Sequence, residues 1–228
     1  MDSSNSTYFL VNDFGNAMSR ARAISTGPYS YLQFITPGVL AQSVLFIAIF
    51  YGITLVWERD VGLLSKLLAT PTPRSAIITG KALSAGIRGL FQAVTVFLIA
   101  LMMQIPLELN FFSIVGSILL CVLIAMIFSC FSMLIASLLK TRDRMMGIGQ
   151  AMTMPLFFAS NAIYPIEIMP SWLQSIAAGN PLTYAVEGLR TLLLTTEYSS
   201  VWVDLCVLFA FTFVFIIFAS RTLKRIIQ

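Results

Sequence analysis

The 228-residue sequence contains no histidine, and only 11% of its residues are charged. Without histidine the chain cannot use an imidazole as a general acid or base, and it cannot form a histidine-ligated metal site. A typical soluble domain has about 25% charged residues, so this chain lacks the polar residues that a water-exposed surface requires. Hydrophobic residues make up 58% of the sequence, and the mean hydropathy is +0.88. The composition therefore predicts a membrane protein whose surface lies largely in lipid.

Three further absences narrow the function. The three cysteines, Cys121, Cys130 and Cys206, lie in long apolar runs and form no C-x-x-C pair, which argues against a zinc site and against disulfides. The sequence has no G-x-x-x-x-G-K-[ST] motif, so we do not expect it to bind ATP. It also lacks H-E-x-x-H and G-x-S-x-G motifs, which argues against an intramembrane enzyme. We predict a protein without catalytic residues, cofactor or metal of its own.

Five apolar stretches are long enough to cross a bilayer, which takes about 20 helical residues. They are residues 33–57, 78–103, 111–139, 145–164 and 201–220. The runs are continuous rather than alternating, which is the pattern of helices. The predicted fold is an all-α polytopic membrane helix bundle with five transmembrane helices.

The distribution of Lys and Arg predicts the orientation of these spans. Eleven of the fourteen basic residues lie in the first and third connections, their flanks and the C-terminal segment. They are Arg59, Lys66, Arg74, Lys81, Arg88, Lys140, Arg142, Arg144, Arg221, Lys224 and Arg225. We therefore expect these segments, including the tail 221–228, to be cytoplasmic, and five spans then place residues 1–32 outside as an N-terminal segment. Since membrane topology accounts for the basic residues, they do not indicate a nucleic-acid partner.

Residues 58–69, in the first cytoplasmic connection, have the spacing of a short amphipathic helix. The apolar positions recur every three or four residues, at Val61, Leu64, Leu67 and Leu68. Pro71 ends the predicted helix because proline lacks a backbone donor. One interpretation is an interfacial helix with snorkelling basic residues. The other is a lever on which a cytoplasmic partner pushes, with Glu58, Arg59 and Asp60 forming ion pairs with that partner.

Residues 165–195, after the fourth predicted span, contain two helical patterns that are too short to cross a membrane. Gly179 ends the first pattern, and Asn180 is expected to cap the second helix with Pro181 at its first position. Ser171 is expected to cap the first helix. We predict an external re-entrant helical hairpin.

Two interpretations of the hairpin are open. It can lie on the membrane surface with Trp172 and Tyr184 as interfacial anchors, or it can form an external gate over a substrate path. Glu187 and Arg190 are three residues apart on one face of the second helix, which suits a local ion pair or a gate contact.

Several short motifs also occur in a specific order along the chain. They are Pro37-Gly38, Trp57-Glu58-Arg59-Asp60-x-Gly62, Leu67-Leu68-x-Thr70-Pro71, Arg74, Gly80-Lys81, Asn180-Pro181-Leu182-Thr183-Tyr184 and Glu187-Gly188-Leu189-Arg190. In this order and spacing, the sequence resembles the membrane (permease) subunit of type-2 ABC exporters from about Leu32 onward. Drug- and polysaccharide-export members are the closest in character.

The resemblance implies a permease half that pairs with a second permease subunit, expected to be an identical chain, and with cytoplasmic ABC ATPase subunits that hold ATP and Mg. It implies that 58–69 is the coupling helix seated on the ATPase and that 165–195 is an external gate. The ATPase-coupling residues would be Glu58, Arg59, Asp60, Gly62, Leu67, Pro71 and Arg74. The gate residues would be Asn180, Pro181, Tyr184, Glu187 and Arg190.

The implied activity is ATP-driven export, by alternating access, of a hydrophobic or amphipathic substrate such as a drug, lipid or glycan. The implied location is the plasma (bacterial inner) membrane. The family usually has six spans, and this chain begins where the first external loop would be, so its first helix is expected to be missing. That expectation supports an alternative function as a non-transporting membrane scaffold or assembly partner.

Overall fold

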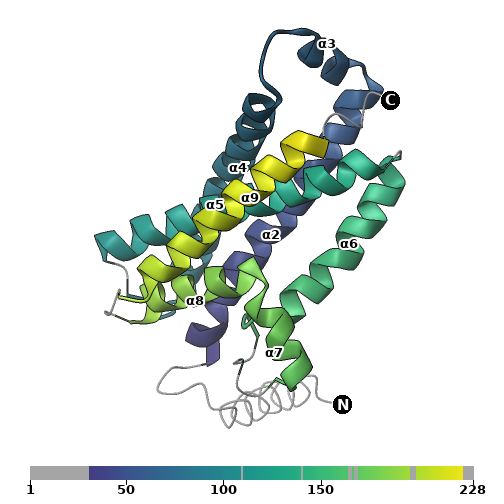
Figure 1. The fold of residues 1–228 in the computed structure, drawn as a ribbon. Coiled ribbons are helices and arrows are strands. Elements are labelled where there is room, and N and C mark those ends of the chain that lie inside the picture. The colour runs from purple at the N-terminus through teal and green to yellow at the C-terminus, as the bar shows by residue number, and fades with distance from the viewer. Residues whose placement is uncertain are drawn as a thin grey trace, which may run out of the picture.

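The computed structural model describes residues 31–108, 110–139, 141–163, 166, 169–195 and 199–222. Its main helices are α2 (Tyr31–Asp60), α3 (Leu63–Ala69), α4 (Arg74–Met102), α5 (Phe111–Leu138), α6 (Arg142–Phe158), α7 (Ser171–Ala178), α8 (Pro181–Leu194) and α9 (Val201–Thr222). The described residues contain no strand, and Figure 1 shows the long helices packed as one bundle. The predicted all-α polytopic bundle is confirmed. Residues 1–30 of the predicted external segment 1–32, and residues 223–228 of the predicted tail 221–228, lie outside the described residues. The remaining residues of these two segments belong to α2 and α9.

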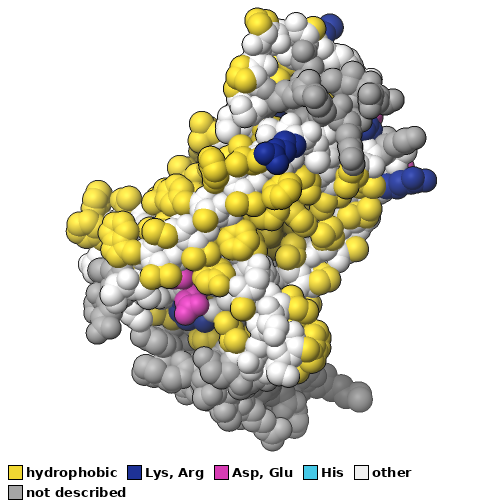
Figure 2. Space-filling view, in the orientation of Figure 1, with side chains coloured by type: hydrophobic (Ala, Val, Ile, Leu, Met, Phe, Trp, Pro, Cys, Tyr) yellow, Lys and Arg dark blue, Asp and Glu magenta, His cyan; other side chains and the backbone are white. Residues whose placement is uncertain are grey.

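Helix α5 is the centre of the bundle. It packs against α2, α4, α8 and α9, and most of its apolar stretch is buried. Helices α4 and α9 lie at the periphery and turn large apolar side chains such as Phe91 and Phe213 outward. Figure 2 shows hydrophobic side chains spread over the face on which α9 lies. An exposed apolar surface of this extent is expected where the helices face lipid.

Among the described residues the structure places a helix at each of the five predicted spans. Four of these helices, α2, α4, α5 and α9, are long and apolar enough to cross a membrane by length and composition. The predicted span 145–164 corresponds to the shorter, 17-residue helix α6, whose first turn contains Asp143 and which runs from the α3 end of the bundle to α7 (Figure 1). At 1.5 Å per residue α6 is about 26 Å long, somewhat less than the roughly 30 Å of bilayer hydrocarbon. Pro155 lies inside the last turn of α6, where it removes one N–H from the hydrogen-bond ladder, and the helix ends three residues later at Phe158.

Two glycines allow α2 to approach its neighbours closely. A Cβ on Gly52 would collide with Ser132 of α5, whose hydroxyl donates a hydrogen bond to the Ile49 carbonyl. A Cβ on Gly38 would collide with the backbone of Ala162, in the turn that follows α6. The Pro37-Gly38 motif therefore marks the contact between the start of α2 and the turn after α6.

Candidate functional site

The prediction of a single helix over residues 58–69 is wrong. Helix α2 continues through Glu58, Arg59 and Asp60, and α3 begins at Leu63. Gly62 lies at the break with a φ of 73°, in the left-handed region that costs about 1–2 kcal/mol for a residue with a Cβ. The chain changes direction there (Figure 1), so the three charged residues lie at the end of α2 rather than on the short helix.

Helix α3 is attached to the bundle chiefly through Leu64. This side chain is 1% exposed and packs in a buried cluster to which α2, α4, α5 and α6 also contribute. Leu67 is half-buried, whereas Val61 and Leu63 are exposed. The apolar face of α3 is therefore narrower than predicted, because Val61 falls in the break and Leu63 points away from the face of Leu64. The exposed residues Val61, Leu63 and Lys66 are called the α3 surface below.

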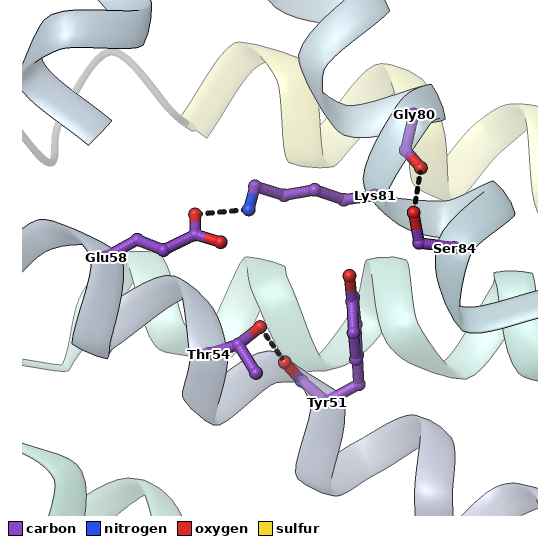
Figure 3. Close-up of polar contacts among 6 residues, drawn as sticks. All are labelled: Tyr51, Thr54, Glu58, Gly80, Lys81 and Ser84. Carbon is purple, nitrogen blue, oxygen red and sulfur yellow. Dashed lines mark hydrogen bonds and ion pairs between the residues drawn. The ribbon is translucent and has the colours of Figure 1, made fainter. Parts of the chain in front are cut away.

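The charged end of α2 contacts neighbouring helices of the same chain. Glu58 Oε2 forms an ion pair with Lys81 Nζ of α4 (Figure 3), and both side chains are mostly buried. Arg59 Nη1 donates a 2.9 Å hydrogen bond to the carbonyl of Leu139, directly after α5. Asp60 Oδ1 lies 3.8 Å from Arg59 Nε. Glu58 and Arg59, which we expected to pair with a partner, thus fasten the ends of α2, α4 and α5 to one another.

A second contact between α2 and α4 lies two helical turns from the first, in the direction of the hairpin end. The guanidinium carbon of Arg88 lies 4.9 Å from the centre of the Tyr51 ring, a cation–π geometry. Tyr51 and Glu58 are seven residues apart on α2, and Lys81 and Arg88 are seven residues apart on α4. These four residues are called the α2–α4 seam. The sequence analysis did not predict the Glu58–Lys81 and Tyr51–Arg88 contacts. The equal seven-residue spacing of these positions on α2 and on α4, two antiparallel helices, is a signal that could have indicated them.

The connection from α3 to α4 contains the remaining predicted coupling residues. Thr70 Oγ1 donates a hydrogen bond of 2.6 Å to the Leu67 carbonyl at the end of α3. Pro71 is exposed, and Pro73 precedes Arg74, the first residue of α4. All the predicted coupling residues therefore lie at one end of the bundle, around α3 (Figure 1).

The hairpin lies at the opposite end of the bundle. The predicted Asn180 cap is confirmed, since its Oδ1 accepts a 3.0 Å hydrogen bond from the Leu182 backbone N–H and Pro181 is the first residue of α8. The Asn180 amide also donates a 2.7 Å hydrogen bond to the Leu156 carbonyl of α6. The Tyr184 hydroxyl donates a 2.8 Å hydrogen bond to the Ala178 carbonyl. The Ser171 cap is wrong: Ser171 is already inside α7 and its side chain does not cap the helix.

Arg190 connects the hairpin to the rest of the bundle. Its guanidinium lies 3.9 Å from the centre of the Phe34 ring on α2, and its Nη2 donates a 2.8 Å hydrogen bond to the Asn161 carbonyl. Glu187, one turn earlier on α8, is exposed. Arg190 therefore joins α8 to α2 and to the turn after α6.

A buried carboxylate lies where α8 meets α9. Asp204, in the first turn of α9, is 5% exposed, and no hydrogen bond to its Oδ2 occurs among the described residues. A Cβ on Gly188 would lie 3.4 Å from this oxygen and 3.0 Å from a methyl group of Leu120 on α5. Gly188 therefore allows α8 to approach both helices closely.

An apolar groove of about 830 Å³ lies between α6, α7, α8 and α9. Its lining includes Met152, Pro155, Trp172, Ile176, Phe211 and Phe215. Helix α6 packs chiefly against α2, which leaves this space between α6 and α9. The groove suits an apolar occupant and offers few polar groups.

The fold and these two ends define a polytopic helical membrane protein with a separate short helix at one end and a helical hairpin at the other. The family model described as ABC-2 type transporter matches residues 4–194. The chain belongs to this family.

Relatives with curated names are similar over most of the chain. A Cyanophora paradoxa protein named as transport permease ycf38 is 32% identical over 170 residues, which cover 74% of this chain and 58% of the relative. The Escherichia coli K12 inner membrane transport permease YadH is 29% identical over 189 residues, which cover 80% of this chain and 70% of the relative. The daunorubicin resistance ABC transporter permease protein DrrB1 of Streptomyces coeruleorubidus is 26% identical over 186 residues, which cover 81% of this chain and 66% of the relative. The chain thus spans 58% of the length of the first of these relatives.

Proposed function

We propose that this chain is the permease subunit of an ATP-driven ABC exporter. It moves a hydrophobic or amphipathic substrate, such as a drug, lipid or glycan, outward by alternating access, and a separate ATPase subunit holds ATP and Mg and hydrolyses the nucleotide. Membership of the ABC-2 type transporter family and the permease names of its relatives support the transport role. The name of the Streptomyces relative supports a drug as one candidate substrate.

The observation that carries the proposal is the way α3 is attached. Leu64 inserts into the buried cluster that joins the ends of the long helices, while the α3 surface stays exposed. The Glu58–Lys81 ion pair and the hydrogen bond from Arg59 to the Leu139 carbonyl hold these helix ends together. Because a close-packed core transmits displacement, an ATPase that moves α3 moves the ends of α2, α4 and α5 as one unit.

The opposite end is suited to a gate. Asn180 ties the hairpin to α6, and Arg190 ties it to α2 and to the turn after α6. A tilt of α2 relative to α6 therefore changes the position of α8. In this proposal the hairpin faces the outside, α3 and the C-terminus face the cytoplasm of a bacterial inner membrane, and a second copy of the chain completes the permease.

The test requires the permease together with its ATPase, which we expect to be the soluble P-loop protein encoded by an adjacent gene. Two leucines at the same end of the bundle provide a matched pair of variants: Leu63 on α3 is 46% exposed and Leu138 at the end of α5 is 62% exposed. We expect Leu63→Asp to lower ATPase co-purification and substrate-stimulated ATP hydrolysis about tenfold, since a docking side chain contributes more than 1.4 kcal/mol. Leu138→Asp is expected to behave as wild type.

Equal coupling in the wild-type, Leu63→Asp and Leu138→Asp complexes contradicts coupling through α3. A permease that purifies from its native membrane without any ATP-hydrolysing subunit contradicts the exporter function altogether. That outcome favours the scaffold alternative.

A further inference from the structure

Arg88 is a cation without an acidic partner in the α2–α4 seam. Glu58, the acidic residue of the seam, is already paired with Lys81. Within the described part of the chain no acidic side chain pairs with Arg88, which is exposed and rests against the Tyr51 ring. The Tyr51 hydroxyl makes no hydrogen bond to the described residues, and Figure 3 shows that Tyr51 rises from α2 toward α4. The seam therefore presents a guanidinium and a phenolic hydroxyl that can both donate to an anion.

The position of this pair along the bundle corresponds to a lipid headgroup. Gln33, near the start of α2, donates a hydrogen bond to the Pro106 carbonyl, between α4 and α5, and Arg59 contacts Leu139 at the other end. Along α2, Tyr51 lies about 27 Å from Gln33 and about 12 Å from Arg59 at 1.5 Å of rise per residue. If Gln33 marks one edge of the roughly 30 Å of bilayer hydrocarbon, Tyr51 lies about 3 Å inside the other edge. The long side chain of Arg88 can extend from this depth to a lipid headgroup.

The surface beside Arg88 is suited to an acyl chain. From Arg88 toward the hairpin end, α4 presents the exposed apolar side chains of Phe91, Val94 and Leu98. Arg88 is thus exposed at the headgroup end of an apolar helix face. An unneutralised cation at the edge of hydrocarbon is costly, and a bound anion lowers that cost because charge interactions are stronger where water is scarce.

We propose that Arg88 and Tyr51 bind the headgroup of an anionic phospholipid, whose acyl chains lie along α4. The planar guanidinium matches two phosphate oxygens, and the Tyr51 hydroxyl adds one donor. The lipid joins α2 and α4 at Tyr51 and Arg88, which lie two helical turns from the Glu58–Lys81 ion pair in the direction of the hairpin end. Its assignment to the cytoplasmic leaflet depends on the orientation given under Proposed function, whereas the binding itself does not.

The experiment uses the purified full chain in detergent, mixed with equal amounts of phosphatidylglycerol and phosphatidylcholine, and native mass spectrometry to count the lipids retained. We expect one phosphatidylglycerol per chain, preferred about tenfold over phosphatidylcholine, the ratio that about 1.4 kcal/mol supplies. Arg88→Gln should abolish this preference. Arg221→Gln, the same substitution at an exposed position in the last turn of α9, should keep it. Tyr51→Phe should weaken the preference less, because the ring remains under Arg88.

Three results overturn the proposal. They are the absence of any phosphatidylglycerol preference in the wild-type chain, an unchanged preference in Arg88→Gln, and an equal loss in Arg88→Gln and Arg221→Gln, which would mean general charge attraction. If Arg88→Gln does not fold, Arg88→Lys replaces it and should reduce the preference without abolishing it, since it keeps the charge and loses the planar fork. A preference equal to that of the wild type in Arg88→Lys counts against the site. No ATPase is present, so failure here leaves the exporter proposal untouched.

Discussion

The ion pair between Glu58 and Lys81 allows a quantitative test of how the α3 end of the bundle is held together. Side-chain exposures of 22% for Glu58 and 12% for Lys81 place the pair between the surface and the interior. Exposed pairs contribute about 0.2–1 kcal/mol, whereas breaking a buried pair costs about 3–5 kcal/mol because one charge is left unpaired. We therefore expect Lys81→Met and Glu58→Gln each to lower the free energy of unfolding by about 2 kcal/mol, between these limits.

The assay is a double-mutant cycle measured by unfolding in mixed detergent micelles titrated with sodium dodecyl sulfate. The double variant should be destabilised less than the sum of the single variants, by about 1–2 kcal/mol, because neither charge is then left alone. The control cycle combines Lys81→Met with Glu187→Gln at the opposite end of the bundle and should be additive to within about 0.5 kcal/mol. Additive behaviour of Glu58→Gln and Lys81→Met would refute the ion pair as a fastening between α2 and α4.

Four other predictions use the same unfolding measurement. Gly38→Ala should destabilise the chain by about 1–3 kcal/mol because its Cβ would meet the backbone of the turn after α6. Gly80→Ala should stabilise it by about 0.5–1 kcal/mol, since α4 is open there. Leu64→Ala should cost about 2–5 kcal/mol, whereas the exposed Leu63→Ala should change stability by less than about 0.5 kcal/mol; equal effects would contradict the packing of α3. Asn180→Ala should cost about 1–2 kcal/mol for the lost cap, and a neutral result would contradict the contact with α6.

The positions of four spans could be predicted from the sequence because hydrophobic runs of this length have no other stable environment than lipid. The helix at the fourth predicted run is shorter than expected at its end, because apolar content does not show where a helix ends. Helix α6 has 17 residues, and the residues after Phe158 form a turn that packs against Gly38. The Asn180-Pro181 start of α8 was predictable because capping depends on neighbours in sequence alone.

The contacts of the candidate-site residues were not predictable from local pattern. Periodicity placed Glu58 on the amphipathic helix, whereas Gly62 ends α2 after it by taking a left-handed conformation. The partners of Arg59 and Arg190 are the Leu139 and Asn161 carbonyls, and backbone carbonyls have no signature in the sequence. Such long-range contacts depend on how the helices pack, which the spacing of apolar residues does not specify.

The central claim is that a nucleotide-hydrolysing subunit contacts this chain through the α3 surface. The most direct measurement is photo-crosslinking in native membranes with benzoylphenylalanine at position 63, and with the same group at position 138 as the control. The account predicts that position 63 captures a P-loop ATPase, identified by mass spectrometry, and that position 138 captures far less of it. Capture of no such subunit from position 63, or equal capture from both positions, would contradict the account.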